Sequence, residues 1–312
     1  MKKALVTGAN GFIGSALVRE LLADNVEVIA LDRNGSNKNI PSEARFVPHE
    51  LSESAVLPEI ISDRDIDVFY HFAWAGSAGP QRLDTALQLN NAQWTVDCLR
   101  AAKAMGCAKF ICAGSVMERE ASAVTESQGY KPGEVYFRGS GIYGSGKLAA
   151  HNMCIPIAAD IGIDIVWTTI TNVYGVGEVS PRFVNSTIRK IINNEPLKFT
   201  SAQQNYDFVY IDDAARAFRL IGEYGKPFCN YTIGSSHAQP LKNFILEMKA
   251  AIAPDREFIF GDIPFTGANL PLCEYDASLT ERDTGFKAEV SFGDGAARTM
   301  KWIKENLNDT EI

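Results

Sequence analysis

Short apolar runs alternate with longer amphipathic stretches through the first half of the chain. The apolar runs that predict strands are Lys3–Thr7, Val26–Leu31, Phe46–Val47, Val68–Phe72, Lys109–Ala113 and Asp164–Ile170. Helical periodicity marks Phe12–Leu22, Thr85–Met105 and Tyr143–Ile161. Strands that are apolar throughout and alternate with helices are typical of a parallel sheet covered on both faces. We therefore expect an α/β fold with a Rossmann-type, doubly wound parallel sheet over residues 1–175.

The strict alternation fails in the second half. Helical periodicity there marks Pro181–Asn193 and Asp294–Asn306. The pattern predicts a smaller α+β region over residues 176–312, which would cap the substrate because ligands of open α/β sheets bind beyond the carboxyl ends of the strands. We expect some of its segments, such as 207–221, to pack back on the first domain.

Composition narrows the class of protein. Of the 312 residues, 46% are hydrophobic and 22% are charged, and the formal net charge is -8. These values are ordinary for a globular protein. An acidic balance without a clustered run of Lys and Arg disfavours nucleic acid and anionic membrane surfaces as partners. No apolar run approaches the roughly 20 residues that span a bilayer, so we expect a cytoplasmic protein.

The cysteines and histidines do not suggest a metal centre. The six cysteines are scattered without C-x-x-C spacing, and the chain has only four histidines. Zinc ligands occur at closer and more regular spacings. We expect no metal site and interpret the cysteines as buried free thiols.

A glycine-rich loop follows the first predicted strand and opens the first helix. Gly8, Gly11 and Gly14 form a G-x-x-G-x-x-G motif, whose glycines permit a tight turn and close approach of a pyrophosphate to the helix N-terminus. Asp32 ends the second strand and can accept hydrogen bonds from an adenosine ribose, which favours NAD. Arg33 favours NADP, so NADP stays possible. A glycine turn without any ligand is the alternative.

Three residues have the chemistry of proton transfer. Tyr143 and Lys147 are spaced i, i+4 and share one face of a predicted helix. A nearby ammonium favours the phenolate form of a tyrosine, which can then take a proton from a sugar hydroxyl or return one to a ketone. Ser115 follows a predicted strand, and its hydroxyl is suited to hydrogen-bond the same reacting oxygen.

These residues belong to a longer set of ordered motifs. The sequence resembles the extended short-chain dehydrogenase/reductase family, specifically its nucleotide-sugar epimerases, dehydratases and ketoreductases, and the resemblance runs nearly end to end. The matching positions are Gly8, Gly11 and Gly14; His71-Phe72-Ala73; Asn91 and Thr95; Ser115, Tyr143 and Lys147; Asn172-Val173-Tyr174-Gly175; Pro181-Arg182-Phe183; Asp207-Phe208-Val209-Tyr210-Ile211-Asp212-Asp213; and Glu281-Arg282-Asp283-Thr284-Gly285-Phe286.

The resemblance implies roles for particular residues. Ser115, Tyr143 and Lys147 would form the catalytic triad, with Lys147 also holding the nicotinamide ribose. The dinucleotide site would comprise the glycine loop and a further set: Phe12, Ile13, Asp32, Arg33, Phe72, Ala73, Asn91, Tyr143, Lys147 and Val173. The substrate contacts would be Asn172, Arg182 and Tyr206. The resemblance also implies a homodimer that pairs the helices Thr85–Met105 and Tyr143–Ile161 of each subunit; packing of both helices on the sheet alone is the alternative.

The chain departs from the 4,6-dehydratase pattern of the family. Those enzymes carry an acidic pair directly after the catalytic hydroxyl, where this chain has Val116 and Met117. Neither side chain can transfer a proton, so dehydration is disfavoured unless Glu118 or Glu120 substitutes. We expect both glutamates to be solvated loop charges.

A second departure concerns the substrate's pyrophosphate. Family members that bind a nucleoside diphosphate place arginines where this chain has Tyr206 and, by rough register, Thr266. An arginine fork grips a pyrophosphate bidentately, and a tyrosine donates a single hydrogen bond. Arg182, Arg189 or Lys190 would have to compensate, although a basic surface face is the simpler role for Arg189 and Lys190.

The leading hypothesis is an NAD(P)-dependent nucleotide-sugar epimerase that acts through a transient keto intermediate. An NAD(P)H-dependent nucleotide-sugar 4-ketoreductase, or a reductase of a smaller hydroxy or keto compound, would use the same residues. A non-catalytic dinucleotide-binding sensor is the alternative from another class. A sensor would be expected to have lost Tyr143 or Lys147, and both are present.

Overall fold

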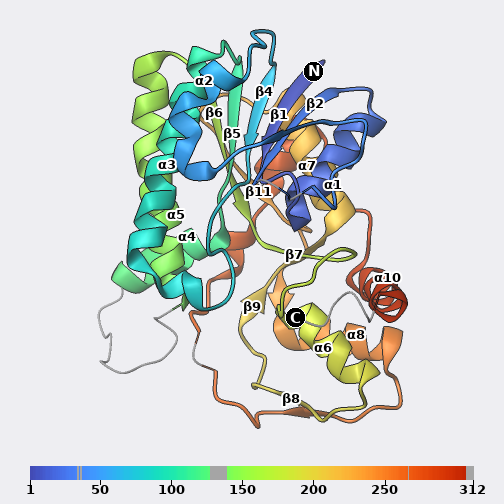
Figure 1. Ribbon diagram of the computed structural model, residues 1–312. Coiled ribbons are helices and arrows are strands. Elements are labelled where there is room, and N and C mark those ends of the chain that lie inside the picture. Colours follow the sequence, from blue (N-terminus) through green and yellow to red (C-terminus); the bar gives the residue numbers. More distant parts are fainter. Residues whose placement is uncertain (34, 36, 127–138, 266, 307–312) are drawn as a thin grey trace.

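The computed structural model describes residues 1–33, 35, 37–126, 139–265 and 267–306 (Figure 1). A seven-stranded parallel sheet runs in the order β11-β6-β5-β4-β1-β2-β3. Its strands are β1 (Lys3–Thr7), β2 (Glu27–Asp32), β3 (Arg45–Pro48), β4 (Val68–His71), β5 (Lys109–Ala113), β6 (Asp164–Ile170) and β11 (Asn230–Ile233). The predicted Rossmann-type sheet is confirmed, and the six predicted strands match within two residues at each end.

Helices cover both faces of this sheet (Figure 1). On one side, α3 (Thr85–Ala104) packs against α5 (Gly139–Ile161), which also contacts α4 (Val116–Glu126). On the other side, α1 (Phe12–Ala23) packs against α7 (Ile211–Tyr224). The short α2 (Leu57–Ile60) follows a 3₁₀ turn and contacts α3.

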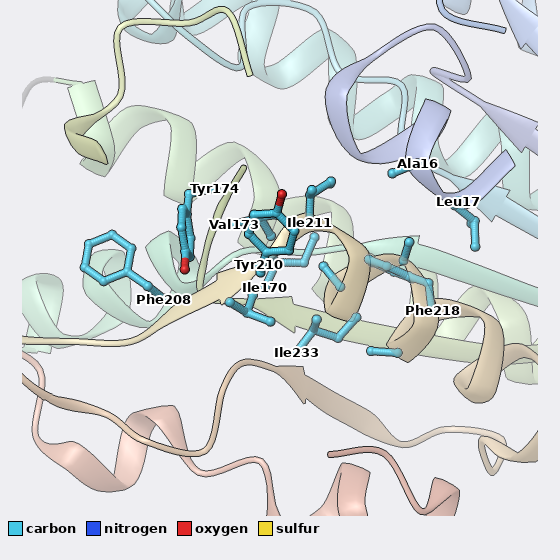
Figure 2. Close-up of a cluster of buried hydrophobic side chains, with 14 of the residues drawn as sticks. Ala16, Leu17, Ile170, Val173, Tyr174, Phe208, Tyr210, Ile211, Phe218 and Ile233 are labelled. Carbon is cyan, nitrogen blue, oxygen red and sulfur yellow. The ribbon is translucent and has the colours of Figure 1, made fainter. Parts of the chain in front are cut away.

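Neighbouring strand residues feed two separate cores, which explains why the strands are apolar throughout. Val6 belongs to the core shared with Leu17 and Phe218, whereas Leu5 belongs to the core shared with Leu99 and Trp167. Figure 2 shows part of the first core, which continues from α1 and α7 to the side chains of Tyr174 and Phe208 beyond the sheet. The sheet and the second part of the molecule are thus joined by continuous apolar packing.

The second part lies beyond the carboxyl ends of the strands (Figure 1). Its strand pairs are β7 (Asn172–Tyr174) with β10 (Phe208–Tyr210), β9 (Asn205–Tyr206) with β12 (Gln239–Pro240), and β8 (Leu197–Phe199) with β13 (Phe258–Phe260). Its helices are α6 (Phe183–Ile192), α8 (Leu241–Ile252), α9 (Ser278–Thr284) and α10 (Phe292–Glu305). Helix α10 packs against α6 and α8. The division at residue 175 stays a prediction, but the chain returns to the sheet through α7 and β11.

The start of α5 differs from the predicted helix because glycines there serve packing. The helix begins at Gly139, before the first predicted residue. A Cβ at Gly144 would lie 2.2 Å from the carbonyl oxygen of Met117, and one at Gly146 would lie 3.0 Å from Gln88. The glycines therefore let α5 approach α4 and α3 closely. They belong to the helix and do not interrupt it.

Among the described residues, no helix is long and apolar enough to cross a membrane. The cysteines are free thiols, and four of the six are buried. The expectation that all are buried is wrong for Cys273, which is exposed, and for Cys229, which is half-buried because it packs at the edge of the first core.

Candidate active site

A cavity of about 390 Å³ lies where the carboxyl edge of the sheet meets the second part of the molecule. Of the residues expected from the sequence, the ones that line it are Ile13, Ser115, Tyr143, Asn172, Val173, Arg182 and Tyr206. They come from the glycine-loop helix, the end of β5, α5, β7, the start of α6 and β9. The structure therefore brings Ser115, Tyr143 and all three predicted substrate contacts to one cavity, whereas Lys147 is not among its lining residues.

Ser115 lies between the end of β5 and the start of α4. Its Oγ accepts a hydrogen bond from the backbone N–H of Met117 at 3.2 Å. Its own backbone N–H donates to Oε1 of Glu118 at 2.8 Å. Both bonds hold Ser115 through residues of α4. Neither uses the hydroxyl hydrogen, which stays available to an oxygen atom in the cavity.

Tyr143 is half-buried on α5, with neighbours on two sides of its ring. The Trp74 ring meets it in an edge-on arrangement, with centroids 6.0 Å apart. The Arg82 guanidinium lies 4.5 Å from the centre of the Tyr143 ring. Aromatic and cation–π contacts of this kind restrict a ring without using its hydroxyl, so the phenol is left free for the cavity.

Lys147 lies one turn after Tyr143 and is almost fully buried, at 3% exposure. Its Nζ donates to the carbonyl oxygen of Ala113 at 2.7 Å and lies 3.8 Å from the centre of the Trp74 ring. A buried ammonium needs such partners because desolvation penalises its charge. Tyr143 and Lys147 both lie on α5, one turn apart, and the ammonium is held at the end of β5. Their joint catalytic role stays a prediction.

The glycine loop has the backbone geometry that a pyrophosphate requires. Gly8 has a φ of +67° and its added Cβ would lie 2.7 Å from the backbone nitrogen of Ala73. A Cβ at Gly14 would lie 2.1 Å from the carbonyl oxygen of Gly8. Side chains are thus excluded where the first strand turns into α1. The resulting cradle at a helix N-terminus fits a dinucleotide's phosphates.

Asp32 ends β2, next to this loop. Its two oxygens accept hydrogen bonds from the backbone N–H groups of Asn10, at 2.9 Å, and Arg33, at 2.8 Å. Each carboxylate oxygen can accept a further bond, so the residue also fits a ribose hydroxyl. The Arg33 side chain is exposed.

Two further residues predicted for the cofactor make structural contacts. Asn91 is fully buried and exchanges two hydrogen bonds of 2.8 Å with the backbone of Ala75. Its amide therefore holds the loop after β4. Phe72 packs edge-on against Phe218, with centroids 4.6 Å apart. Direct contact of Asn91, Phe72 and Phe12 with a cofactor stays a prediction.

The expectation that Glu118 and Glu120 are solvated loop charges is wrong. Both lie on α4, which starts immediately after Ser115 and turns residue 118 toward the sheet. Glu118 is 5% exposed; it accepts hydrogen bonds from Nε1 of Trp167 at 3.1 Å and lies 3.1 Å from Nδ1 of His151. Glu120 is half-buried, and burial raises its pKa to about 7. Neither glutamate is among the residues that line the cavity.

The three predicted substrate contacts differ in the interactions that their side chains already make within the protein. The Asn172 amide donates to the carbonyl oxygen of Asp207 at 3.0 Å. Tyr206 stacks on Phe208, and burial raises the pKa of Tyr206 to about 12, so it stays a hydrogen-bond donor at neutral pH. Arg182 is exposed, with its Nε 3.6 Å from Oε2 of Glu178. Thr266 lies outside the described residues.

Sequence reasoning missed Arg82, Trp74 and Glu178. Arg82 lies on the 3₁₀ turn η2 (Pro80–Leu83), lines the cavity and contacts the Tyr143 ring. Its position in a loop gives no periodic signal. A signal was nonetheless available, because loops at the carboxyl ends of sheet strands carry functional residues. Arg189 and Lys190 are not among the residues that line the cavity.

The fold is a doubly wound α/β sheet with a glycine loop after its first strand, and a cavity at the carboxyl edge of the sheet contains Ser115 and Tyr143. The NAD dependent epimerase/dehydratase family model matches residues 4–234. The chain belongs to this family, and the resemblance to extended short-chain dehydrogenases/reductases is confirmed. Enzymes of this family depend on NAD.

Full-length relatives span three reactions. A probable dTDP-glucose 4,6-dehydratase of Sinorhizobium fredii is 25% identical, with 97% of this chain and 93% of that protein covered. A putative UDP-glucose 4-epimerase of Methanocaldococcus jannaschii is 26% identical over 97% of this chain and 98% of that protein. The dTDP-4-dehydro-6-deoxyglucose reductase of Escherichia coli is 25% identical, with 96% of this chain and 97% of that protein covered.

Solved structures share the fold. The Bordetella bronchiseptica enzyme WbmF in complex with NADH has a TM-score of 0.79 at 20% identity, covering 99% of this chain and 94% of that one. The UDP-glucuronic acid 4-epimerase of Bacillus cereus, in complex with UDP-glucuronic acid and NAD, has a TM-score of 0.75 at 23% identity. The match covers 97% of this chain and 99% of that one.

Proposed function

We propose that this protein is an NAD-dependent nucleotide-sugar epimerase that acts through a transient keto sugar. One observation carries the proposal: Ser115 and Tyr143 line a single cavity, and neither Glu118 nor Glu120 is among the residues that line it. A site with a proton-transfer group but without the extra acid of a dehydratase supports oxidation and reduction at one carbon.

The residues divide the chemistry as follows. NAD would be held by the glycine loop and Asp32 and would supply reversible hydride transfer at the sugar carbon. Tyr143 takes the proton of the hydroxyl on that carbon and later gives it back. Ser115 donates a hydrogen bond to the same oxygen, and Lys147 supplies a fixed positive charge one helical turn from the phenol. Return of the hydride to the opposite face inverts the carbon.

Further parts of the proposal concern cofactor choice, assembly and location. The Asp32 carboxylate at the end of β2 would repel a 2′-phosphate, which supports NAD over NADP. A homodimer through α3 and α5 is supported by Leu89 and Met153, apolar side chains that are 63% and 39% exposed on those helices. We place the enzyme in the cytoplasm.

A 4-ketoreductase is the second candidate. It would use Ser115, Tyr143 and Lys147 unchanged, and the reductase of E. coli is as similar in sequence as the epimerase of M. jannaschii, at 25% and 26% identity. The two differ in cofactor turnover, because an epimerase regenerates its NAD within each cycle and a reductase consumes one NADH or NADPH.

The test uses the purified protein with a panel of UDP- and dTDP-sugars. Products are identified by NMR, and NADH is followed by its absorbance. The epimerase proposal predicts an epimer at equilibrium with no net change in NADH, and NAD recovered from the denatured protein. Stoichiometric consumption of NADH or NADPH would show a reductase, and loss of water from the sugar would show a dehydratase.

A further inference from the structure

Arg82 faces the active-site cavity from η2 with unused hydrogen-bonding capacity. Its side chain lines the cavity together with Ser115, and its guanidinium lies 4.5 Å from the centre of the Tyr143 ring. Its Nε is buried and has no hydrogen-bond partner within the described part of the chain. A guanidinium presents five N–H donors in a rigid planar fork, so donors remain available beside the proton-transfer group.

The surrounding charges leave Arg82 poorly compensated. Glu120 attracts its guanidinium, but burial favours the protonated, neutral form of that glutamate. Arg182, which lines the same cavity, repels Arg82. Arg182 itself lies 3.6 Å from Glu178, and the Glu178 carboxylate also accepts a hydrogen bond from the backbone of Ser180 at 2.9 Å. Two guanidinium groups therefore share the cavity with Glu178, whose carboxylate is already engaged by Arg182 and Ser180.

We propose that Arg82, with Arg182, forms a subsite beside Tyr143 for an oxyanion carried by the substrate, either a carboxylate or a phosphate. The planar fork of an arginine matches either group bidentately. This inference rests on the proposed function and deepens it. It also supplies a site for an anionic substrate in a protein whose net charge is -8.

The location of Arg82 favours one source of the oxyanion. Its guanidinium is in contact with the ring of the residue that reacts with the sugar hydroxyl. A carboxylate on the sugar itself lies within one sugar ring of the reacting carbon, so it reaches Arg82 while the hydroxyl reaches Tyr143. The diphosphate of the nucleotide is the other source, because Arg182 and Tyr206, from the second part of the molecule, line the same cavity as Arg82.

The experiment measures binding to the NAD-loaded protein by calorimetry. The ligands are UDP-glucuronic acid, UDP-glucose, free glucuronate and inorganic pyrophosphate. The variants are Arg82→Gln, Arg82→Lys and, as a matched control, Arg45→Gln. Arg45 starts β3 at the opposite edge of the sheet, where it pairs with Asp63. Retention of NAD and an unchanged circular dichroism spectrum verify that each variant is folded.

Arg82→Gln is expected to weaken oxyanion binding on the order of tenfold or more, because a charge-assisted bond is lost. Weakening confined to UDP-glucuronic acid and glucuronate identifies the sugar carboxylate. Weakening that extends to UDP-glucose and pyrophosphate identifies the diphosphate. The affinity of Arg82→Lys, which keeps the charge and loses the planar fork, should lie between those of Arg82→Gln and the wild type. The affinity of Arg45→Gln should match that of the wild type.

The subsite is overturned if Arg82→Gln binds every ligand as tightly as the wild type. If turnover alone then falls, Arg82 acts only by restraining the Tyr143 ring. Failure of the proposed function looks different: UDP-sugars would not bind the wild type, whereas glucuronate or pyrophosphate would still bind in an Arg82-dependent way. If neither anion binds the wild type more tightly than Arg82→Gln, the subsite is excluded whatever the enzyme's reaction is.

Discussion

A buried histidine close to Lys147 is neutral. His71 is fully buried between Thr7 and Thr95, with ring-nitrogen distances of 3.0 and 3.2 Å to their hydroxyls. Burial and the nearby Lys147 charge lower the pKa of His71 to about 3, so this imidazole is neutral at physiological pH. The proposed proton-transfer site therefore has a neutral imidazole beside the lysine that follows Tyr143 by one helical turn.

Removing the phenol isolates its role. Tyr143→Phe deletes only the proton-transfer group, and the ring contacts with Trp74 and Arg82 stay possible. We expect turnover to fall by about 10²- to 10⁴-fold, with NAD retention and melting temperature unchanged. Steady-state kinetics and cofactor release check this. Tyr224→Phe, at a tyrosine that is 58% exposed, is the control and should behave as wild type. Normal turnover in Tyr143→Phe would contradict the mechanism.

Glu120 predicts a pH-dependent stability. Burial raises its pKa from about 4.5 to about 7 in the folded protein, so the folded state binds more protons than the unfolded state between these values. The free energy of unfolding that protonated Glu120 contributes is therefore fully present below about pH 4.5 and is lost as the pH rises through about 7. Glu120→Gln, which cannot ionise, should gain stability relative to wild type across that range. Urea unfolding at several pH values measures the difference, and a constant difference would refute the assignment.

At the scale of elements, one carboxylate connects four of them next to Ser115, the serine of the proposed mechanism. Glu118 of α4 accepts the backbone N–H of Ser115 after β5, contacts Trp167 of β6 and pairs with His151 of α5. The His151 and Trp167 rings stack at 4.3 Å. The position of Ser115 is thus set by packing between the elements as well as by the end of its own strand.

The close approach of α5 to α4 gives a graded test. Gly144→Ala would place a Cβ 2.2 Å from a backbone oxygen, whereas Gly146→Ala would place one 3.0 Å from Gln88. We expect Gly144→Ala to cost about 1–3 kcal/mol of unfolding free energy and to lower turnover, because α5 carries Tyr143. Gly146→Ala should cost less. Chemical denaturation and kinetics of the pair check this order; equal effects, or none, would argue against the helix contact.

Local patterns predicted what depends on local sequence. The strands, the glycine loop and the i, i+4 pair of Tyr143 and Lys147 follow from residue type and spacing. The burial of Glu118 did not, because it depends on Trp167 and His151, which are distant in sequence. Arg82 was missed for the same reason: its contact with Tyr143 arises from tertiary packing of an irregular loop. Likewise, β11 joins the sheet after an excursion of the chain that no periodicity marks.

At the scale of the whole molecule, assembly is the open property with a direct test. The exposed Leu89 on α3 contributes apolar surface to the proposed α3–α5 interface. We expect a dimer in sedimentation analysis, and Leu89→Glu should shift it to monomer because a buried charge is costly in an apolar interface. Leu246→Glu, at an equally apolar side chain that is 45% exposed on α8, should remain dimeric. A monomeric wild type would exclude the dimer.

The central claim, that hydride leaves and returns within one active site, has a direct isotopic test. The substrate identified from the panel is prepared with deuterium on the carbon that is epimerised, and the reaction is run with an excess of unlabelled NADH in solution. Mass spectrometry and NMR then measure deuterium at that carbon in the product. We predict complete retention of the label. Loss of deuterium from the product to the external cofactor pool would contradict the account and establish a reaction in which the cofactor exchanges at every turnover.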